Sequence, residues 1–176
     1  MIFFYLLDLF TIPEIYEILM EITFITSRDL TKHEKRVAKT IFGDNIELQF
    51  VRMNSKNQLA RSLKIAYVSF NHINYFTSIP DQILVHELVH VWQYQHFGSV
   101  YIYKALKAQN SEKGYNYGSV ITLAEIQLEN GNILNFNFEQ QGDIFQDYYL
   151  QTLNQKDSNL ELAVYKYYVD GIKDLV

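Results

Sequence analysis

Apolar residues recur at helical spacing along most of this chain, and they follow a strand-like pattern in two short stretches before residue 71. The helical stretches are residues 11–21, 30–42, 78–98, 100–108, 120–129, 136–153 and 160–176. Residues 46–53 and 63–70 predict strands, and the second could extend to Phe76. Residues 54–59, 109–119 and 130–132 predict turns and loops, and the apolar segment 1–10 predicts a packed first helix or strand. We expect one domain over residues 1–176 with an α+β fold, mostly helical with a small sheet.

Capping boxes predict the starts of two helices. Thr11 is followed three residues later by Glu14, and Thr31 by Glu34. Gly43 is placed to end the second helix. The apolar positions predicted to face inward are Ile15, Ile18, Leu19 and Ile22 in the first helix and Val37, Ala38, Ile41 and Phe42 in the second.

Residues 78–98 form the most apolar of the predicted helices. Ser78 can cap its start, Pro80 suits its first turn and Gly98 is placed to end it. Apolar residues fill most positions from 79 to 92, so the helix should be buried on most sides.

Against this apolar background stands the motif His86-Glu87-x-x-His90. The two histidines are four residues apart and share a helix face, so both imidazoles can ligate one tetrahedral zinc ion. Glu87 can then reach a metal-bound water and take its proton. The plainer alternative is a polar stripe on a half-buried helix, but buried His and Glu side chains usually have a partner.

Composition narrows the classes of site. The chain has no cysteine, which excludes disulfides, thiolate zinc sites and a cysteine nucleophile. The net charge of -5 without a basic stripe argues against nucleic acid as a partner. The first residues lack the pattern of a signal peptide, and Asp8 and Pro13 interrupt the apolar start before it could span a membrane. We therefore expect a cytoplasmic protein, with export by a non-classical secretion system left open, and the oligomeric state is not predicted.

A catalytic zinc site needs a third protein ligand. His96 has the spacing of a third histidine, but Gln93 stands where that arrangement has a turn-forming glycine, and no methionine follows the motif. Glu139 is the better candidate because it lies on the later helix at 136–153. Glu125 and Glu129 are weaker alternatives.

Asp143 lies one turn after Glu139 and can accept the free ring N–H of a ligating histidine. Gly142, between them in the helix, can allow close approach of the two helices at a cost of about 1 kcal/mol relative to alanine.

The motif His86-Glu87-x-x-His90 with a downstream Glu139-x-x-x-Asp143 resembles the gluzincin group of zinc metallopeptidases. More narrowly, residues 30–44, 81–93 and 139–141 resemble small bacterial zincin-like domains found near polymorphic-toxin and contractile-secretion genes. Phe138 departs from the asparagine that gluzincins often have before the glutamate ligand. The resemblance implies a zincin-like fold with the small sheet beside the motif helix, where an edge strand could pair with an extended peptide; an internal strand is the equal alternative.

The resemblance also implies hydrolysis of a peptide or protein substrate. Zn²⁺ would be held by His86, His90 and Glu139, and Glu87 would act as general base. Such sites often use a tyrosine or histidine to stabilise the oxyanion. Tyr117, in a glycine-flanked loop, is preferred over Tyr115, Tyr148 and His96. The alternative function is a non-catalytic, zinc-containing accessory or binding module of a bacterial secretion or toxin system, and the third is an interaction module without metal.

Overall fold

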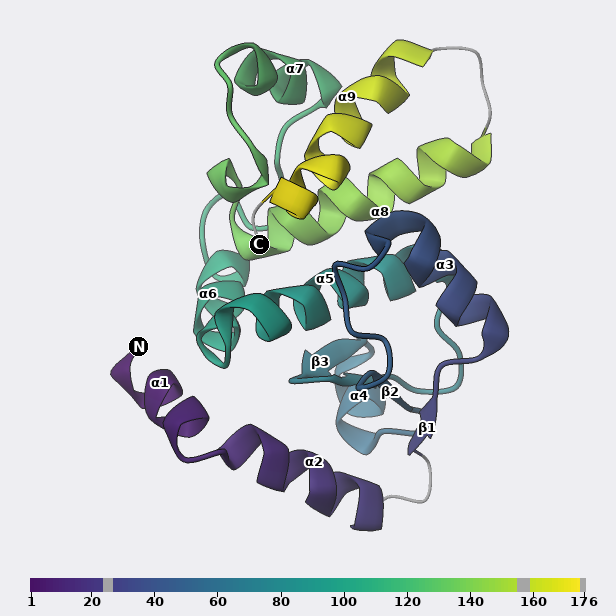
Figure 1. Cartoon of the computed structure of the whole chain (residues 1–176), viewed down its shortest axis with the longest axis vertical. Coiled ribbons are helices and arrows are strands. Elements are labelled where there is room, and N and C mark those ends of the chain that lie inside the picture. The colour runs from purple at the N-terminus through teal and green to yellow at the C-terminus, as the bar shows by residue number, and fades with distance from the viewer. Residues whose placement is uncertain (24–26, 155–158, 175–176) are drawn as a thin grey trace.

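Two long helices, α5 (Asp81–Phe97) and α8 (Phe138–Asn154), pack against each other through the middle of the molecule. The computed structural model describes residues 1–23, 27–154 and 159–174. Figure 1 shows the small sheet on one side of α5, with α8 and then α9 on the other. The two N-terminal helices run along the outside, beyond the sheet.

The fold is mixed α+β and mostly helical, as predicted. The other helices are α1 (Ile2–Leu9), α2 (Ile12–Thr23), α3 (Lys32–Phe42), α4 (Gln58–Leu63), α6 (Val100–Gln109), α7 (Val120–Leu128) and α9 (Asn159–Asp170), with 3-10 turns at Ile133–Asn135 and Gly171–Asp174. The strands β1 (Ser27–Asp29), β2 (Arg52–Asn54), β3 (Tyr67–Ser69) and β4 (His72–Asn74) form a sheet in the order β1-β2-β4-β3. Only the β2–β4 pair is parallel among the described strands.

Helix α5 is buried as its composition predicts, since every side chain from Leu84 to Gln93 is removed from solvent. Gly98 ends the helix with a φ of +67°, in the left-handed region that glycine adopts without strain. The predicted start is wrong: the helix begins at Asp81, and Pro80 is the cap residue without a side-chain hydrogen bond. Ser78 lies two residues before the cap position and does not cap the helix.

The capping box of α3 is confirmed. Thr31 accepts a hydrogen bond from the N–H of Glu34, whose carboxylate accepts one from the N–H of Thr31. The same carboxylate accepts two hydrogen bonds of 2.8 Å from Arg28. Glu34 therefore fixes the helix start and also ties α3 to β1.

The strand predictions need correction. Residues 46–51 form tight turns, although Ile46 and Val51 are buried, and only the end of the predicted strand 46–53 belongs to β2. The predicted turn at 54–59 includes the start of α4, which Asn57 caps. The predicted strand 63–70 shrinks to β3, because Lys64 has a φ of +58°. Such short elements leave no apolar repeat to detect, and neither β1 nor β4 was predicted as a separate strand.

The N-terminal segment is helical but not packed as predicted. No residue of α1 is buried, and Ile15, Ile18 and Leu19 of α2 are 49%, 57% and 56% exposed. The Ile22 side chain lies outside the described residues. The opposite face of α2 makes the contact instead, where Tyr16 packs on Phe70 at a centroid distance of 5.3 Å.

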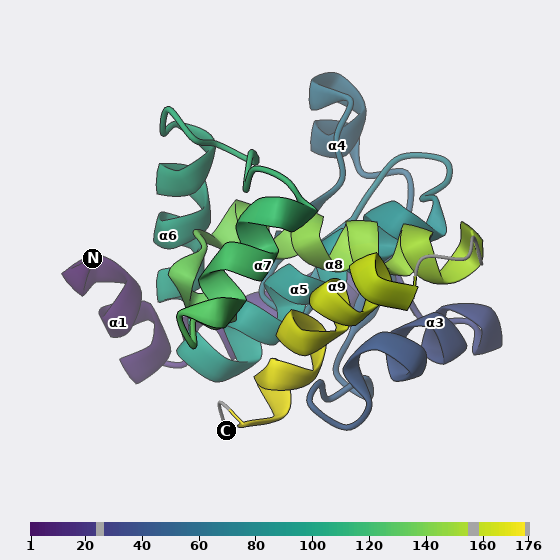
Figure 2. The same ribbon diagram turned by 90° about the horizontal axis from the view of Figure 1, so that it is seen from above.

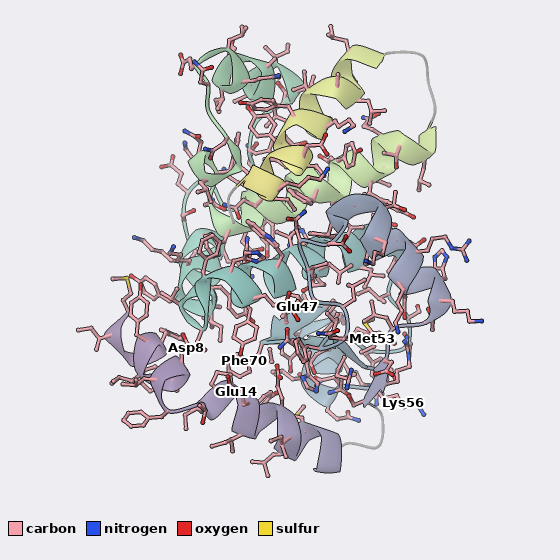
Figure 3. The ribbon with its side chains drawn as sticks, viewed as in Figure 1. Asp8, Glu14, Glu47, Met53, Lys56 and Phe70 are labelled. Carbon is pink, nitrogen blue, oxygen red and sulfur yellow. The ribbon has the colours of Figure 1, made fainter. Side chains whose placement is uncertain are left out.

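Polar contacts anchor both N-terminal helices. Glu17 accepts a hydrogen bond from the N–H of Asn71, and Asp8 accepts from the N–H and the hydroxyl of Ser99. Figure 3 shows Asp8 on the side of α1 that faces the body, and Phe70 on the side of the body that faces α2.

The final helix also ends earlier than predicted. Helix α9 stops at Asp170, a 3-10 turn follows, and Val176 lies outside the described residues. Within the described part of the chain, no helix combines the length and the apolar character that crossing a membrane requires.

Glu34→Gln tests the α3 capping box and its ion pair. Burial raises the pKa of Glu34, but the hydrogen bonds from Arg28 and Thr31 outweigh it and leave the pKa below 4.5. The carboxylate therefore stabilises the fold fully above pH 4.5, and this contribution is lost as the pH falls through the lowered folded-state value. We expect Glu34→Gln to lower the free energy of unfolding by about 1–2 kcal/mol at pH 7.

Urea unfolding at a series of pH values measures the effect, and Glu112→Gln, at an exposed loop carboxylate, is the control. The difference between wild type and Glu34→Gln should shrink below pH 4.5. A difference that is absent at pH 7, or that grows in acid, would contradict this role.

Candidate metal centre

Three predicted ligands meet where α5 packs on α8. Oε2 of Glu139 lies 3.4 Å from Nε2 of His86 and 3.4 Å from Nε2 of His90. The three residues are 1–8% exposed. The described residues thus contain a buried group of two imidazoles and one carboxylate that could hold a metal ion.

The position of Glu139 follows from how α8 begins. The side-chain oxygen of Asn137 accepts hydrogen bonds from the N–H groups of Glu139 and Gln140. Glu139 then lies in the first helical turn, where the helix dipole favours a carboxylate. Phe138 packs on Phe97 of α5, with a centroid distance of 5.6 Å. An aromatic residue before the glutamate is therefore compatible with this position, although the resembling family often has asparagine there.

Nδ1, the ring nitrogen of each histidine that does not face Glu139, has its own partner. Nδ1 of His86 lies 3.0 Å from a carboxylate oxygen of Asp143, the residue predicted for this contact. Nδ1 of His90 lies 2.8 Å from the side-chain oxygen of Gln93. The amide nitrogen of Gln93 donates to the carbonyl oxygen of Phe138 and to the side-chain oxygen of Gln141.

These contacts fix the tautomer of His90. Because the Gln93 nitrogen is committed to two oxygens, its own oxygen faces the ring and accepts a proton from Nδ1. Neutral His90 then keeps its lone pair on Nε2, the atom that faces Glu139. Partners of this kind orient metal-ligating histidines in known sites.

The far oxygen of Glu139 is also held. Oε1 accepts a hydrogen bond of 3.0 Å from Gln109 of α6. Oε2 is buried and, among the described residues, has no hydrogen-bond partner. Only one oxygen of the carboxylate is therefore left to face the two imidazoles.

The spacing of these atoms fits a metal ion. Two ligands placed about 2.0–2.1 Å from a tetrahedral zinc ion lie roughly 3.4 Å apart. The Glu139 oxygen is at this separation from both ring nitrogens, which is too long for a good hydrogen bond to either. A set of two nitrogens and one oxygen is the ligand chemistry of catalytic zinc.

The electrostatics of the group favour a cation. Burial raises the pKa of Glu139, but the two imidazoles outweigh it and bring the pKa to about 2. Burial lowers the pKa of His86, and the carboxylates of Asp143 and Glu139 then raise it to about 10. A metal ion binding at neutral pH must therefore displace a proton from this group.

Gly142 allows the two helices to approach at the cluster. A Cβ atom on Gly142 would lie 2.5 Å from Cε1 of the His86 ring and 2.7 Å from each ring nitrogen. The predicted close approach is confirmed, and its specific partner is the His86 ring itself.

The other candidates for the third ligand lie elsewhere. Nδ1 of His96 donates a hydrogen bond to the carbonyl oxygen of Trp92, and the His96 ring packs on the Trp92 indole. Glu125 and Glu129 are exposed on or beside α7. None of the three belongs to the ligand group.

The preference for Tyr117 as the oxyanion-stabilising residue does not agree with the geometry. Its hydroxyl donates to Asp147 and bonds to the hydroxyl of Tyr165 at 2.8 Å. Tyr115, two residues earlier, instead lines the cavity beside the cluster, with its ring centroid 6.1 Å from that of His86. Burial and the nearby carboxylates of Glu139 and Glu87 raise the pKa of Tyr115 to about 12, so its hydroxyl is protonated at neutral pH. Loop composition alone could not show which tyrosine turns toward the cluster.

A cavity of about 840 Å³ adjoins the cluster and reaches it through Glu87, His86 and His90. Strand β3, at the edge of the sheet, lines this cavity. The edge-strand interpretation is thus confirmed over that of an internal strand.

Two residues of the site were not predicted in their roles. Gln93 could have been suspected, because it is three residues after His90 on the same helix face. Gln109 gave no signal, since its contact with Glu139 depends on how α6 packs on α8.

Comparison with known proteins gives one informative similarity. No protein-family model matches the chain, and no solved structure matches it. The chain is similar to the type VI secretion system spike protein VgrG2b of Pseudomonas aeruginosa, with 32% identity over 139 residues. The similarity covers 70% of this chain but 13% of that protein, so the chain spans a small part of its relative.

Gly142→Ala is expected to disturb the site while preserving the fold. The added methyl group would displace the His86 ring, although alanine is the better helix former. We expect at least a tenfold loss of zinc affinity, measured by competition with a chromophoric chelator. Gly171→Ala, where no atom lies within 4 Å of the added Cβ, should bind zinc as the wild type does. Equal affinity of Gly142→Ala and wild type would show that the ring does not depend on this contact.

Proposed function

We propose that this chain is a zinc-dependent peptide hydrolase. The observation that carries the proposal is the convergence of His86, His90 and Glu139 beside a buried carboxylate, Glu87, at one side of a cavity. The three ligands would hold zinc, which polarises carbonyl groups and lowers the pKa of coordinated water to about 7. A zincin-like architecture, a helix pair beside a sheet with a cavity-lining edge strand, is part of the proposal.

Glu87 is placed to move the proton in this reaction. It follows His86 on α5, lines the cavity, and among the described residues has a buried oxygen without a hydrogen-bond partner. Burial raises its pKa, more than the imidazoles of His86 and His90 lower it. A carboxylate with a raised pKa can take a proton from the attacking water and return it to the leaving amine.

Two further features suit a peptide substrate. The edge of the sheet at the start of β3, next to Ala66, can pair with an extended chain, which would align a peptide bond beside the cluster. The ring of Tyr115 lies beside that of His86, and its hydroxyl, protonated at neutral pH, would stabilise the negative charge that develops on the carbonyl oxygen.

The similarity to a spike protein supports association with a type VI secretion system, and we propose export by that route. It also favours a second candidate function, that of a non-catalytic module with structural zinc. The two differ in coordination: a structural site needs a fourth protein ligand, whereas a catalytic site keeps a position for water. The described group has three ligands, and His96 is turned to Trp92, which favours catalysis.

Glu87→Gln separates catalysis from metal binding. The substitution keeps the shape of the side chain but removes the base, so peptide cleavage should fall by about 10²–10⁴-fold. Zinc content, measured by elemental analysis, should remain one ion per chain, whereas His86→Ala should lose the ion. Glu129→Gln, at an exposed carboxylate, is the matched control. A Glu87→Gln variant with wild-type cleavage would refute the assigned role.

Tyr115→Phe and Tyr117→Phe form a matched pair. Removal of the Tyr115 hydroxyl should lower kcat by about 10²-fold or more with little effect on KM, because the contact forms in the transition state. Tyr117→Phe should change the thermal midpoint rather than kcat, since its hydroxyl binds Asp147. Steady-state kinetics with a fluorogenic peptide measure both. A loss of kcat in Tyr117→Phe but not in Tyr115→Phe would instead assign oxyanion stabilisation to Tyr117.

A further inference from the structure

The cavity beside the cluster has two aliphatic walls. Leu59 and Leu63 of α4 with Ile65 form one wall, and Ile102, Ala105 and Leu106 of α6 form the other. Figure 2 shows α4 and α6 projecting on the same side of α5 and α8. The walls therefore come from segments about forty residues apart, which meet only in the folded chain.

Four of the wall residues are unusually exposed for large aliphatic side chains, whereas Ala105 is buried and Ile102 is half-buried. Leu59, Leu63 and Ile65 are 52%, 54% and 51% exposed, and Leu106 is 51% exposed. Clustered exposed apolar side chains around a concave site mark a place where a partner group is buried. Packing within this chain does not account for them, because they remain open to solvent in the folded structure.

Most charged residues that line the cavity lie at the metal-ligand cluster. The acids Glu87, Glu139 and Asp143 lie with the imidazoles, while Lys64 is the charged residue on the walls among the described lining residues. Lys64 is exposed, and an ion pair at such a position contributes little. A charged side chain placed between the walls would thus lose water without a strong partner.

Tyr101 limits where a bound peptide can lie along β3. Its hydroxyl donates to the carbonyl oxygen of Val68 and accepts from the N–H of Phe70. The outward-facing backbone at this end of β3 is therefore occupied. An added strand can pair only before that point, next to Ala66 and the wall residue Ile65.

We propose that the cavity binds a large apolar side chain, such as leucine, of an extended peptide substrate, between the α4 wall and the α6 wall. The proposal names the substrate class of the proposed hydrolase and rests on that function. Selectivity arises because a leucine side chain buries aliphatic surface on both walls, which glycine cannot do and aspartate or lysine can do only by losing hydration.

Binding and cleavage are measured separately in the test. The probes are acetylated seven-residue alanine peptides that carry leucine, glycine, aspartate or lysine at the central position. Affinity is measured by calorimetry on zinc-loaded Glu87→Gln, and kcat/KM on the zinc-loaded wild type. We expect the leucine peptide to exceed each of the others by about tenfold or more in both measurements.

Variants then locate the selectivity. Leu106→Gln and Leu63→Gln, one on each wall, should each reduce the ratio of leucine-peptide to glycine-peptide affinity several-fold. Two variants are used so that the test stands even if one of them does not fold. Leu128→Gln, at a residue 85% exposed on α7, is the matched control and should keep the wild-type ratio.

The outcomes distinguish the two proposals. Selective binding without cleavage of any peptide would support the apolar pocket and overturn hydrolysis. Cleavage without preference, or a ratio unchanged in both wall variants, would overturn the pocket and leave hydrolysis standing.

Discussion

The contact between α5 and α8 at Gly142 is the constraint on which the site depends. The His86 ring lies where a larger residue would place its Cβ atom, so the two helices approach as closely as a backbone and an imidazole allow. This approach brings Glu139, one turn before, to 3.4 Å from both ring nitrogens. Apolar side chains cover the rest of α5, and this lets the helix bury four polar side chains, those of His86, Glu87, His90 and Gln93.

A set of amide contacts makes the ligand geometry specific. Gln93 and Gln141 connect His90 to the start of α8, and Gln109 holds one oxygen of Glu139. Neutral amides position these groups without adding charge, so the negative charge of the site remains on carboxylates. The site thus attracts a cation, while the walls of the adjoining cavity stay apolar.

Features that depend on neighbouring residues along the chain could be predicted from the sequence. The spacing of His86 and His90, the cap at Thr31 and the stop at Gly98 follow from helix geometry, and the structure has all three. Glu139 and Asp143 could be predicted because a second helix with acids one turn apart can face the first. The metal itself and the reaction stay predictions.

Where the structure differs from what the sequence indicated, the difference depends on tertiary packing. The short strands and α4 contain too few residues for a periodic pattern, and the chain reverses at Phe70 through a φ of +60° that its composition does not indicate. Tyr117 and Tyr115 are neighbours in one loop, and only the packing of Asp147 and Tyr165 decides which turns away from the cluster. The exposed face of α2 was assigned inward because apolar character alone does not show which side meets the body.

The most direct test of the central claim is anomalous diffraction at the zinc edge from crystals of the zinc-loaded protein. The account predicts a single strong peak about 2 Å from Nε2 of His86, Nε2 of His90 and Oε2 of Glu139, with the remaining position facing the cavity. A peak bound by other residues, or a fourth protein ligand in that position, would contradict it.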